Sequence, residues 1–504
     1  MFNILNLING RHSDLLKKSG LSLLFLTFAI YKLTNTTADP DLWGYLAFGK
    51  AYWEKGKFLY QDIFSYLPSH SRWIYHEWLT GVIFFPLYQA MGALGLQLLK
   101  YSLGLSTLLV IYMTARRRSA DHYATIFVLF AISELLEFGY SPVRAQVFTF
   151  FFLALTFYIL ETARLTSRWK ILLWLIPIQV IWCNLHGGFL VGLGLLGLYM
   201  IGELVSRKPF IQYFNILFLS SLVTLINPYG IEYWIYLIRS IPMPRPELTE
   251  WASVYTSFSS GILHNYALLY LIFWGIFSVL LLWWLKRWEP TAYIGLAVTL
   301  YLGLMHIRHI NLFLLFAGIY MPVWLTTFLQ AMKSDVKIHR LLQRVGWKIP
   351  ALVGVFLIFC WSGKAIIQNP LSLKLPSQPN HDDKYSMYYP VGAVDYIKKN
   401  FLSGNILTEF SWGEYLIWEL YPQCLVALDG RYEQVYPDHI TREYFDFIFG
   451  RGNWKQFLDK YPANMILIQA GSSVCSLIQN TSQWQKTYAD QGSALFVKKA
   501  CSNS

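Results

Sequence analysis

The chain has 504 residues, of which 55% are hydrophobic, 18% aromatic and only 14% charged. Soluble domains carry roughly 25% charged residues, so this composition excludes an ordinary soluble protein and indicates an integral membrane protein. The formal net charge of +12 would suit a nucleic-acid-binding protein. However, the basic residues lie in short stretches between apolar segments, so no nucleic-acid partner is expected.

Repeated apolar segments predict eleven membrane-spanning helices, because about 20 apolar residues cross the hydrocarbon core of a bilayer. They cover residues 20–37, 94–114, 122–139, 143–162, 169–185, 187–205, 209–226, 265–285, 290–306, 310–329 and 349–367. The shorter apolar stretch 78–92 is expected to form a helix at the outer membrane surface, or dipping into it. A cleaved signal peptide is an alternative for 21–34, although a retained anchor fits the downstream topology better.

The basic residues mark one side of the membrane. They collect at the ends of alternate spans, in the stretches 11–18, 116–121, 161–170, 203–208, 286–289 and 333–348. These stretches hold 18 basic and six acidic residues, an excess that equals the whole net charge of +12. The positive-inside rule assigns this side to the cytoplasm, which predicts a multi-pass protein with a cytoplasmic N-terminus and its C-terminal segment outside.

The long apolar segments stop near residue 370, which predicts two domains. A transmembrane domain covers 1–369, with a first outer loop at 38–93, and a soluble outer domain covers 370–504. Within 385–499, strand-like and helix-like stretches alternate, as is typical of a small α/β domain with a mainly parallel sheet. The stretch LDGRYE, which ends at Glu433, follows a predicted strand, where such folds often bind ligands. We favour a structural or acceptor-guiding lid over an independent catalytic site.

The cysteines give little sign of a metal site. The five cysteines, at 183, 360, 424, 475 and 501, show no CxxC or Cys/His spacing. If one disulfide forms in the outer domain, Cys475 with Cys501 is the favoured pair.

Polar and charged residues gather at the outer ends of the predicted spans. They are Asp39, Asp41, His76, Glu77, Glu134, Glu137, Arg144, Gln146, Asn184, His186, Asn227, Tyr229, Glu250, Trp251, Arg308, His309 and Asn311. The cytoplasmic loops, by contrast, are short basic stretches in which no such clusters are expected. A single His or Arg at a helix end can reach the interface without a function. For the whole set we expect an aqueous cavity that opens outward.

These residue types narrow the chemistry of such a cavity. Carboxylates near histidines suit general acid–base catalysis, and buried arginines suit phosphate or carboxylate groups. An anionic lipid head group beside a carboxylate base is therefore the expected substrate arrangement. A proton-coupled transporter would use the same residue types, but it predicts broken helices near the membrane centre, often in inverted repeats. The sequence shows neither feature, which favours an enzyme.

The stretch PDLWGYLAFGKAYWEKG, residues 40–56, resembles the first-loop motif of the GT-C superfamily of membrane glycosyltransferases. The resemblance is to the branch that includes aminoarabinose transferases and protein mannosyltransferases. Pro40, Asp41 and Tyr45 match its motif, whereas Leu42 stands where that branch has an acidic residue. The stretches PVRAQVF, NLHGGF, NPYG and RHINLF resemble uncharacterised bacterial members of the superfamily.

The resemblance implies a polytopic α-helical GT-C-like fold in a bacterial cytoplasmic membrane. The implied activity is transfer of a sugar from a polyprenyl-phosphate-linked donor to a lipid, glycan or protein acceptor on the outer face, by a single inverting displacement. An envelope polysaccharide ligase or polymerase and a non-catalytic transporter are the alternatives.

The resemblance also implies roles for individual residues. Asp41 is the candidate general base, and Asp39 is its partner. Together they are candidate ligands of a divalent cation, Mg or Mn, which some members use. Arg308 and then Arg144 are candidates for holding the carrier phosphate. The other expected pocket residues are His186, His76, Glu77, His309, Gln146 and Tyr45. Alternatively, Asp41 merely caps the amphipathic helix expected directly after it, since Asp is a common N-cap residue.

Overall fold

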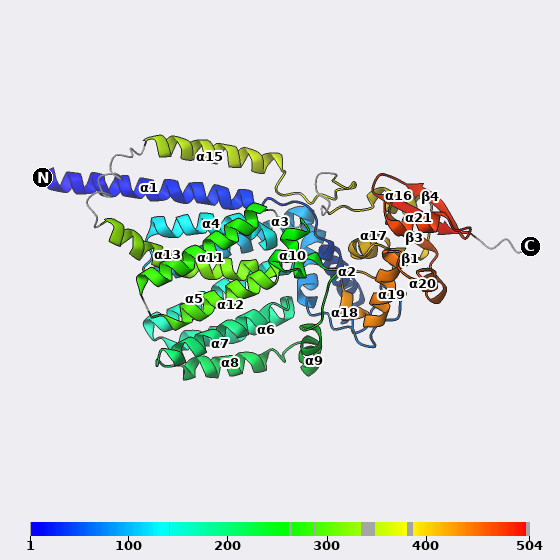
Figure 1. Cartoon of the computed structure of the whole chain (residues 1–504), viewed down its shortest axis with the longest axis horizontal. Helices are drawn as coiled ribbons and strands as arrows, with labels where there is room; N and C mark the ends of the chain where they lie inside the picture. Colours follow the sequence, from blue (N-terminus) through cyan, green and yellow to red (C-terminus); the bar gives the residue numbers. More distant parts are fainter. Residues whose placement is uncertain are drawn as a thin grey trace, which may run out of the picture.

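The structure is a computed structural model that describes residues 2–140, 142–261, 265–286, 288–333, 348–380 and 387–499. Figure 1 shows a bundle of long helices at one end of the molecule and a small sheet domain at the other. Helix α1 (Phe2–Lys32) begins at the end of the bundle that faces away from the sheet domain. Helix α2 (Pro40–Lys55) lies between the bundle and the sheet domain.

Each of the eleven predicted spans coincides with a helix. The helices are α1, the second part of α3 (Trp78–Arg117), α4 (His122–Tyr140), α5 (Gln146–Thr166), α6 (Leu175–Leu185) with the preceding 3₁₀ turn η1 (Trp169–Trp174), α7 (Phe189–Val205), α8 (Ile211–Val223), α11 (Asn265–Leu285), α12 (Pro290–Met305), α13 (Ile310–Lys333) and α15 (Lys348–Ile367). Within the described residues, five helices are long and apolar enough to cross a membrane, and five more apolar helices are shorter, at 10–17 residues. The count of eleven spans therefore stays a prediction.

Helix α3 contains both the predicted surface helix and the span that follows it, with a break between them. Gly92 has φ +59° and ψ −143°, a conformation that glycine adopts without the steric cost of a Cβ. Before this break, α3 packs closely on α2, because a Cβ on Gly49 would lie only 2.1 Å from the carbonyl oxygen of Gly81. The two glycines thus let the backbones of the two helices touch.

The sheet domain contains five strands in the order β2-β1-β3-β5-β4. The strands are β1 (Gly404–Thr408), β2 (Cys424–Val426), β3 (Met465–Gln469), β4 (Trp484–Ala489) and β5 (Ser493–Lys498). Strand β1 is parallel to β2 and β3, whereas β5 is antiparallel to β3 and β4. The sheet is therefore mixed rather than mainly parallel. A loop of only residues 490–492 joins β4 to β5, which is too short for the crossover that parallel neighbours need.

Shorter helices lie around the sheet and in the connections between the long helices. They are α16 (Val391–Lys399), η4 (Phe410–Trp412), α17 (Gly413–Leu420), α18 (Tyr432–Val435), α19 (Asp438–Ile448), α20 (Lys455–Lys460) and α21 (Ser473–Gln479) in the sheet domain, and α9 (Ile231–Ser240), η2 (Thr249–Trp251), α10 (Val254–Ser259) and η3 (Ile307–His309) elsewhere. Cys475 in α21 is buried. Its predicted partner Cys501 lies outside the described residues, as do Arg287 and the predicted cytoplasmic stretch 334–347.

The first loop is built into the sheet domain. Ser65 forms a parallel β-bridge with Val426 of β2, in which the amide of Val426 donates to the Phe64 carbonyl at 3.0 Å. Arg431, which follows β2, pairs with Asp62 of the loop. Side chains of α2 and of the sheet domain share one hydrophobic core. The first loop and the sheet domain therefore position each other, while the predicted domain boundary at residue 370 stays a prediction.

The end of the bundle away from the sheet domain holds a buried ion network. Arg118 contacts Glu161 at 2.5 Å and Glu289 at 2.8 Å, and Arg164 contacts Glu203 at 2.8 Å and Glu289 at 2.9 Å. The expectation that the loops on this side carry no such cluster is therefore wrong. The network was missed because Arg118, Glu203 and Glu289 come from different segments and reach Glu161 and Arg164 of α5 only through the packing of the bundle.

Gly44 tests how tightly the sheet domain is docked on α2. Its amide donates to Glu414 Oε2 at 3.0 Å, and a Cβ on Gly44 would lie 2.2 Å from the same oxygen. We expect Gly44→Ala to displace Glu414 and to lower the free energy of unfolding by about 1–3 kcal/mol, the usual cost of overpacking. The readout is the melting temperature of the full chain in detergent.

The matched control is Gly194→Ala in α7, where a Cβ would meet no atom within 4 Å. Because alanine favours helix more than glycine does, this variant should melt at the wild-type temperature or above it. Equal melting temperatures for the two variants would contradict the tight docking.

Candidate functional site

Asp39 and Asp41 lie at the start of α2, immediately after the segment that follows α1. Asp39 is the N-cap of α2, since its Oδ1 accepts the amide hydrogen of Asp41 at 3.1 Å, and Pro40 occupies the first helical position. The capping role considered for Asp41 therefore belongs to Asp39. The carboxylate of Asp41 instead faces Arg144.

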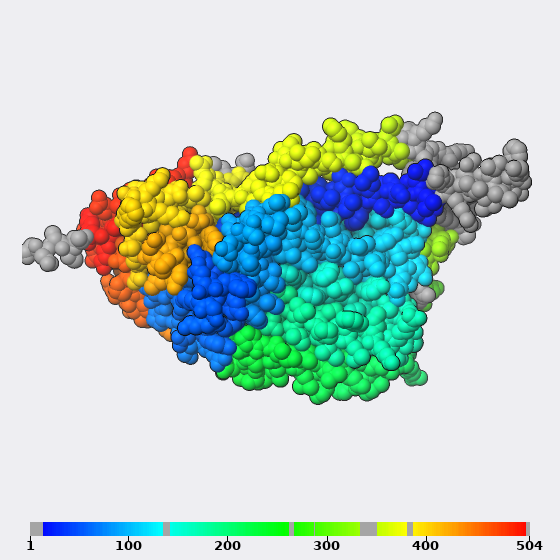
Figure 2. Space-filling model, turned by 180° about the vertical axis from the view of Figure 1, so that it is seen from behind, coloured from blue at the N-terminus to red at the C-terminus, as the bar shows by residue number. Residues whose placement is uncertain are grey.

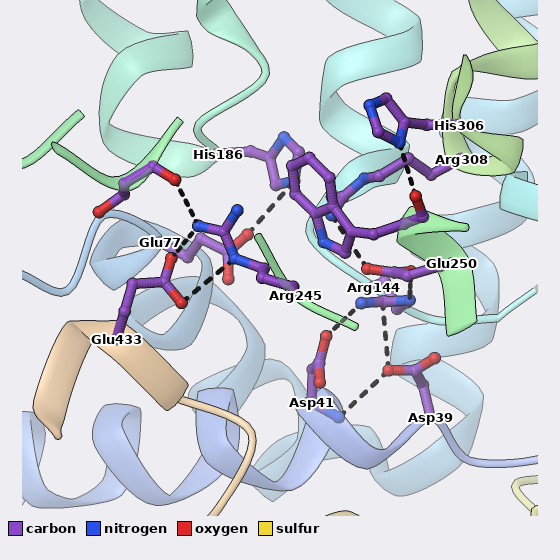
Figure 3. A network of polar contacts seen from close by, with 12 residues as sticks. Asp39, Asp41, Glu77, Arg144, His186, Arg245, Glu250, His306, Arg308 and Glu433 are labelled. Atoms are coloured by element: carbon purple, nitrogen blue, oxygen red, sulfur yellow. Dashed lines mark hydrogen bonds and ion pairs between the residues drawn. The ribbon is translucent and has the colours of Figure 1, made fainter. Parts of the chain in front are cut away.

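Arg144, two residues before α5, contacts three carboxylates at once. It pairs with Asp41, its Nε lies 3.2 Å from Asp39 Oδ1, and its Nη1 lies 3.1 Å from Glu250 Oε2. The other oxygen of Glu250 lies 3.0 Å from Nη1 of Arg308, which belongs to η3. Figure 3 shows these five residues as one connected set, called here the carboxylate–arginine network.

Burial and charge act in opposite directions on the acids of this network. Burial raises the pKa of Asp39 to about 7, although the Arg144 charge opposes the shift. Burial also disfavours the ionised form of Glu250, but Arg308 and Arg144 outweigh it and lower the pKa of Glu250 to about 2. Glu250 therefore stays ionised at neutral pH, whereas Asp39 is close to its titration point.

Two arginines pack against the ring of Trp251. The guanidinium carbons of Arg245 and Arg308 lie 4.6 and 4.5 Å from the ring centre, a geometry in which cation–π attraction stabilises the pair. Arg245 also pairs with Glu433 of the sheet domain at 2.5 Å. Nδ1 of His306 lies 2.6 Å from the Trp251 carbonyl, so this nitrogen donates. These contacts bring Arg245 close to the carboxylate–arginine network (Figure 3).

A second polar group surrounds Glu77. The hydroxyl of Tyr45 donates to Glu77 Oε2 at 3.0 Å, and Nε2 of His186 lies 3.3 Å from Oε1. Nδ1 of His186 accepts the amide hydrogen of Gly188 at 2.9 Å, so the ring proton sits on Nε2 and points toward Glu77. Nε2 of His76 lies 3.7 Å from the same carboxyl oxygen.

Burial keeps this second group largely neutral. It raises the pKa of Glu77 to about 8 and lowers that of His76 to about 4. Burial, with His76 and two arginines nearby, holds the pKa of His186 well below its ordinary value. At neutral pH this group therefore offers hydrogen-bond donors and acceptors rather than ions.

Two residues of the sheet domain, Glu414 and Gly430, lie next to Asp41. A Cβ on Gly430 would lie 2.9 Å from Glu414 Oε1 and 3.3 Å from Asp41 Oδ1, so the three residues meet at one point. Glu414 is buried, and burial, with Asp41 and Asp429 beside it, raises its pKa well above the usual range. Glu414 is thus a neutral carboxylic acid next to Asp41.

The structure places most of the predicted site residues together. Asp39, Asp41, Arg144 and Arg308 lie in the carboxylate–arginine network, and Tyr45, Glu77, His76 and His186 lie in the second group. His309 lies beside Trp251, with ring centres 6.2 Å apart. Gln146 begins α5, and among the described residues its side chain makes no hydrogen bond to either group.

Arg245 and Glu414 were missed by sequence reasoning. The stretch WGEYLIWEL carries Glu414 in apolar surroundings, and this isolated acid was the available signal. Arg245 lies between prolines in a loop, where nothing in the sequence distinguishes it from a solvated residue. Glu433 closes the LDGRYE stretch, for which a structural or acceptor-guiding role was favoured, and it pairs with Arg245. That role stays a prediction.

The arrangement of Asp39 and Asp41 does not fit a divalent cation. Both carboxylates contact the guanidinium of Arg144, which already supplies the positive charge between them. In the described part of the chain, no group of three or more His, Cys, Asp or Glu side chains is arranged to hold a metal ion. Mg²⁺ is usually bound through one or two carboxylates together with waters and substrate phosphates, so these two residues alone do not define a site.

Glu77 should make the stability of the chain depend on pH. Its pKa is raised from 4.5 to about 8 in the folded state, so the folded chain binds this proton more tightly than the unfolded chain does. The resulting stabilisation is complete below about pH 4.5 and is lost as the pH rises through about 8. The melting temperature of Glu77→Gln should therefore fall less than that of the wild type between about pH 5 and pH 9.

Glu443→Gln, in an exposed ion pair with Lys460, is the control, and its melting temperature should follow that of the wild type. Parallel curves for Glu77→Gln and wild type would contradict a protonated Glu77.

Comparison with profiles of known protein families and with curated proteins finds no match to this sequence. Two solved structures share its fold. One is ArnT from Cupriavidus metallidurans bound to undecaprenyl phosphate, with 14% sequence identity, a TM-score of 0.53, and coverage of 96% of this chain and 98% of that chain. The other is the same protein in the apo state, with 14% identity, a TM-score of 0.52, and coverage of 97% and 98%. At this identity the similarity establishes the fold alone, so the chain shares the overall fold of these ArnT structures.

Proposed function

We propose that the chain is an integral-membrane glycosyltransferase that moves a sugar from a polyprenyl-phosphate-linked donor to an acceptor. The observation that carries the proposal is the carboxylate–arginine network, in which Asp41 and Arg308 are linked through Arg144 and Glu250. Asp41 contacts one guanidinium directly and is linked to a second through Glu250, and guanidiniums suit a phosphate just as a carboxylate suits a general base. The shared fold of an ArnT structure that holds undecaprenyl phosphate supports this class of donor.

Asp41 is the general base in this proposal. The acceptor hydroxyl or amine gives its proton to Asp41 while its oxygen or nitrogen bonds to the anomeric carbon of the sugar. The bond from that carbon to the phosphate oxygen breaks, and the polyprenyl phosphate leaves with the electron pair. Attack from the face opposite the leaving group inverts the anomeric centre. Because the leaving group is already a phosphate, stabilising its charge matters more than protonating it.

Arg308 and Arg144 stabilise the carrier phosphate. In the absence of substrate, Glu250 bridges the two guanidiniums and holds them in place. A phosphate with two or three free oxygens would accept from the same donors and compete with Glu250. The planar, paired N–H groups of arginine suit this exchange better than a point charge would.

The remaining groups position the sugar and tune the base. The neutral group of Tyr45, Glu77 and His186 offers hydrogen bonds to sugar hydroxyls. Burial and the neighbouring carboxylates raise the pKa of Glu414 well above the usual range, so beside Asp41 it offers a carboxylic acid proton as a hydrogen-bond donor. In this proposal the site faces the outside of a bacterial cytoplasmic membrane, which the charge distribution of the loops supports. The acceptor is a lipid, a glycan or a protein.

Asp41→Asn tests the base. We expect transfer to fall by about 10²–10⁴-fold, the usual contribution of a positioned acid or base, while the protein still folds because Arg144 keeps Asp39 and Glu250 as partners. The assay measures sugar transfer in proteoliposomes from a panel of undecaprenyl-phosphate sugars. Asp395→Asn, on the exposed surface of α16, is the control and should retain wild-type transfer. Full transfer by a well-folded Asp41→Asn variant would refute the role of Asp41.

Arg308→Gln tests phosphate binding without catalysis. Undecaprenyl phosphate should raise the melting temperature of the wild type, because a ligand that binds only the folded state stabilises it. Losing one charge-assisted hydrogen bond should raise the concentration needed for half of this effect by about tenfold or more. Arg442→Gln, on the exposed side of α19, should behave as the wild type. If Arg308→Gln needs no more ligand than Arg442→Gln, the phosphate contact is assigned to the wrong residue.

A further inference from the structure

A cavity lined by polar residues lies away from the carboxylate–arginine network, at the ends of α1 and α15 that face the sheet domain. Its volume is about 360 Å³, within the range of small-ligand sites. Every residue that lines it carries a polar group, among them Tyr31, Lys32, Asn35, Gln368 and Lys374. A mainly polar cavity beside long apolar helices points to a ligand with a polar head.

The charge around this cavity is mainly positive. Lys32 and Lys374 line it, Lys364 lies 5.9 Å from the ring centre of Tyr31, and Nζ of Lys100 donates to the Asn35 carbonyl at 2.9 Å. Glu134, which pairs with Lys32 at 3.0 Å, offsets one of these charges. Lys374 has no acidic partner among the described residues. An anion therefore fits the cavity better than a neutral or cationic group does.

The surroundings of the cavity are apolar and open to lipid. Figures 1 and 2 both show α15 beside α1 along one edge of the bundle. Only 6% of the residues in the segment Pro350–Ile367 are buried in the protein. Ile366 and Ile367, at the end of α15 next to the cavity, are 74% and 82% exposed. Acyl chains could lie along these exposed side chains while a head group enters the cavity.

We propose that this cavity binds the phosphate head group of an anionic membrane lipid, with the acyl chains along the exposed faces of α1 and α15. Lysine ammonium groups and the Tyr31 hydroxyl supply donors for the phosphate oxygens. The two helices end at the level of the cavity, which is where a head group lies if these helices cross the membrane. The proposal does not depend on the glycosyltransferase activity.

The backbone that forms the cavity leads directly to α2. The amide of Lys374 donates to the Thr36 carbonyl at 2.7 Å, and the amide of Ala38 donates to the Lys374 carbonyl at 3.0 Å. Ala38 precedes Asp39, the N-cap of α2. A lipid bound here would therefore stabilise residues 34–38, the segment that leads into α2 and Asp41.

Native mass spectrometry of the purified full chain tests the proposal. The chain is titrated with phosphatidylglycerol, with phosphatidylcholine or with inorganic phosphate, and retained ligand is counted. We expect one phosphatidylglycerol to bind about tenfold more tightly than phosphatidylcholine, because only the first carries a net negative charge. Lys374→Glu should weaken phosphatidylglycerol binding by about tenfold, and Lys374→Gln should weaken it less. Lys399→Glu, on the surface of the sheet domain, makes the same charge change and should have no effect.

Three results would overturn the proposal. One is equal retention of the two lipids by the wild type. Another is phosphatidylglycerol binding by both Lys374 variants that matches Lys399→Glu. Third, if inorganic phosphate displaces phosphatidylglycerol at equal concentration, the cavity is a site for free phosphate and the lipid assignment is wrong.

Discussion

The candidate site depends on the contact of Arg144 with three carboxylates. A buried guanidinium is tolerated only when it is paired, and removing it would leave Asp39, Asp41 and Glu250 close together without a cation. Through this contact, Arg144 connects the start of α2 to the η2 turn, and Glu250 extends the connection to Arg308. The same charges that hold these segments together are those that a phosphate and a base would use. In this chain, structural pairing and proposed chemistry therefore share the same atoms.

The sheet domain is one side of this site and not only a cover over it. The first loop contributes a β-bridge to the edge of its sheet, and α2 shares its hydrophobic core. This docking brings Glu414 and Gly430 to Asp41, and Glu433 to Arg245. Burial and the charges of Asp41 and Asp429 raise the pKa of Glu414 although Arg431 opposes the shift, so the domain also influences the charge of the site.

The two ends of the bundle both contain ion networks, but they differ in how far solvent can reach them. At the end away from the sheet domain, the side chains of Glu161 and Glu203 are 0% and 3% exposed, so their charges are fully used in pairing. At the sheet-domain end, the side chains of Arg308 and Glu250 are 22% and 32% exposed. The second network is the more open to a ligand, which is why the first is best explained as a clamp between helices and the second as a site.

The sequence by itself determined the features that depend on local pattern or on sums along the chain. Apolar length located the eleven helices, Gly92 separated the surface helix from its span, and the position of polar residues at span ends grouped Asp41, Arg144 and Arg308 on one side. The tertiary structure alone decided which groups touch. Gly44 and Glu414 are 370 residues apart, and Arg245 and Glu433 are 188 apart. Contacts over such separations leave no local trace, because they arise only when distant segments pack together, and the far ion network escaped prediction for the same reason. The antiparallel pair of β4 and β5 differs, because the short loop 490–492 that joins these strands is a local feature of the sequence.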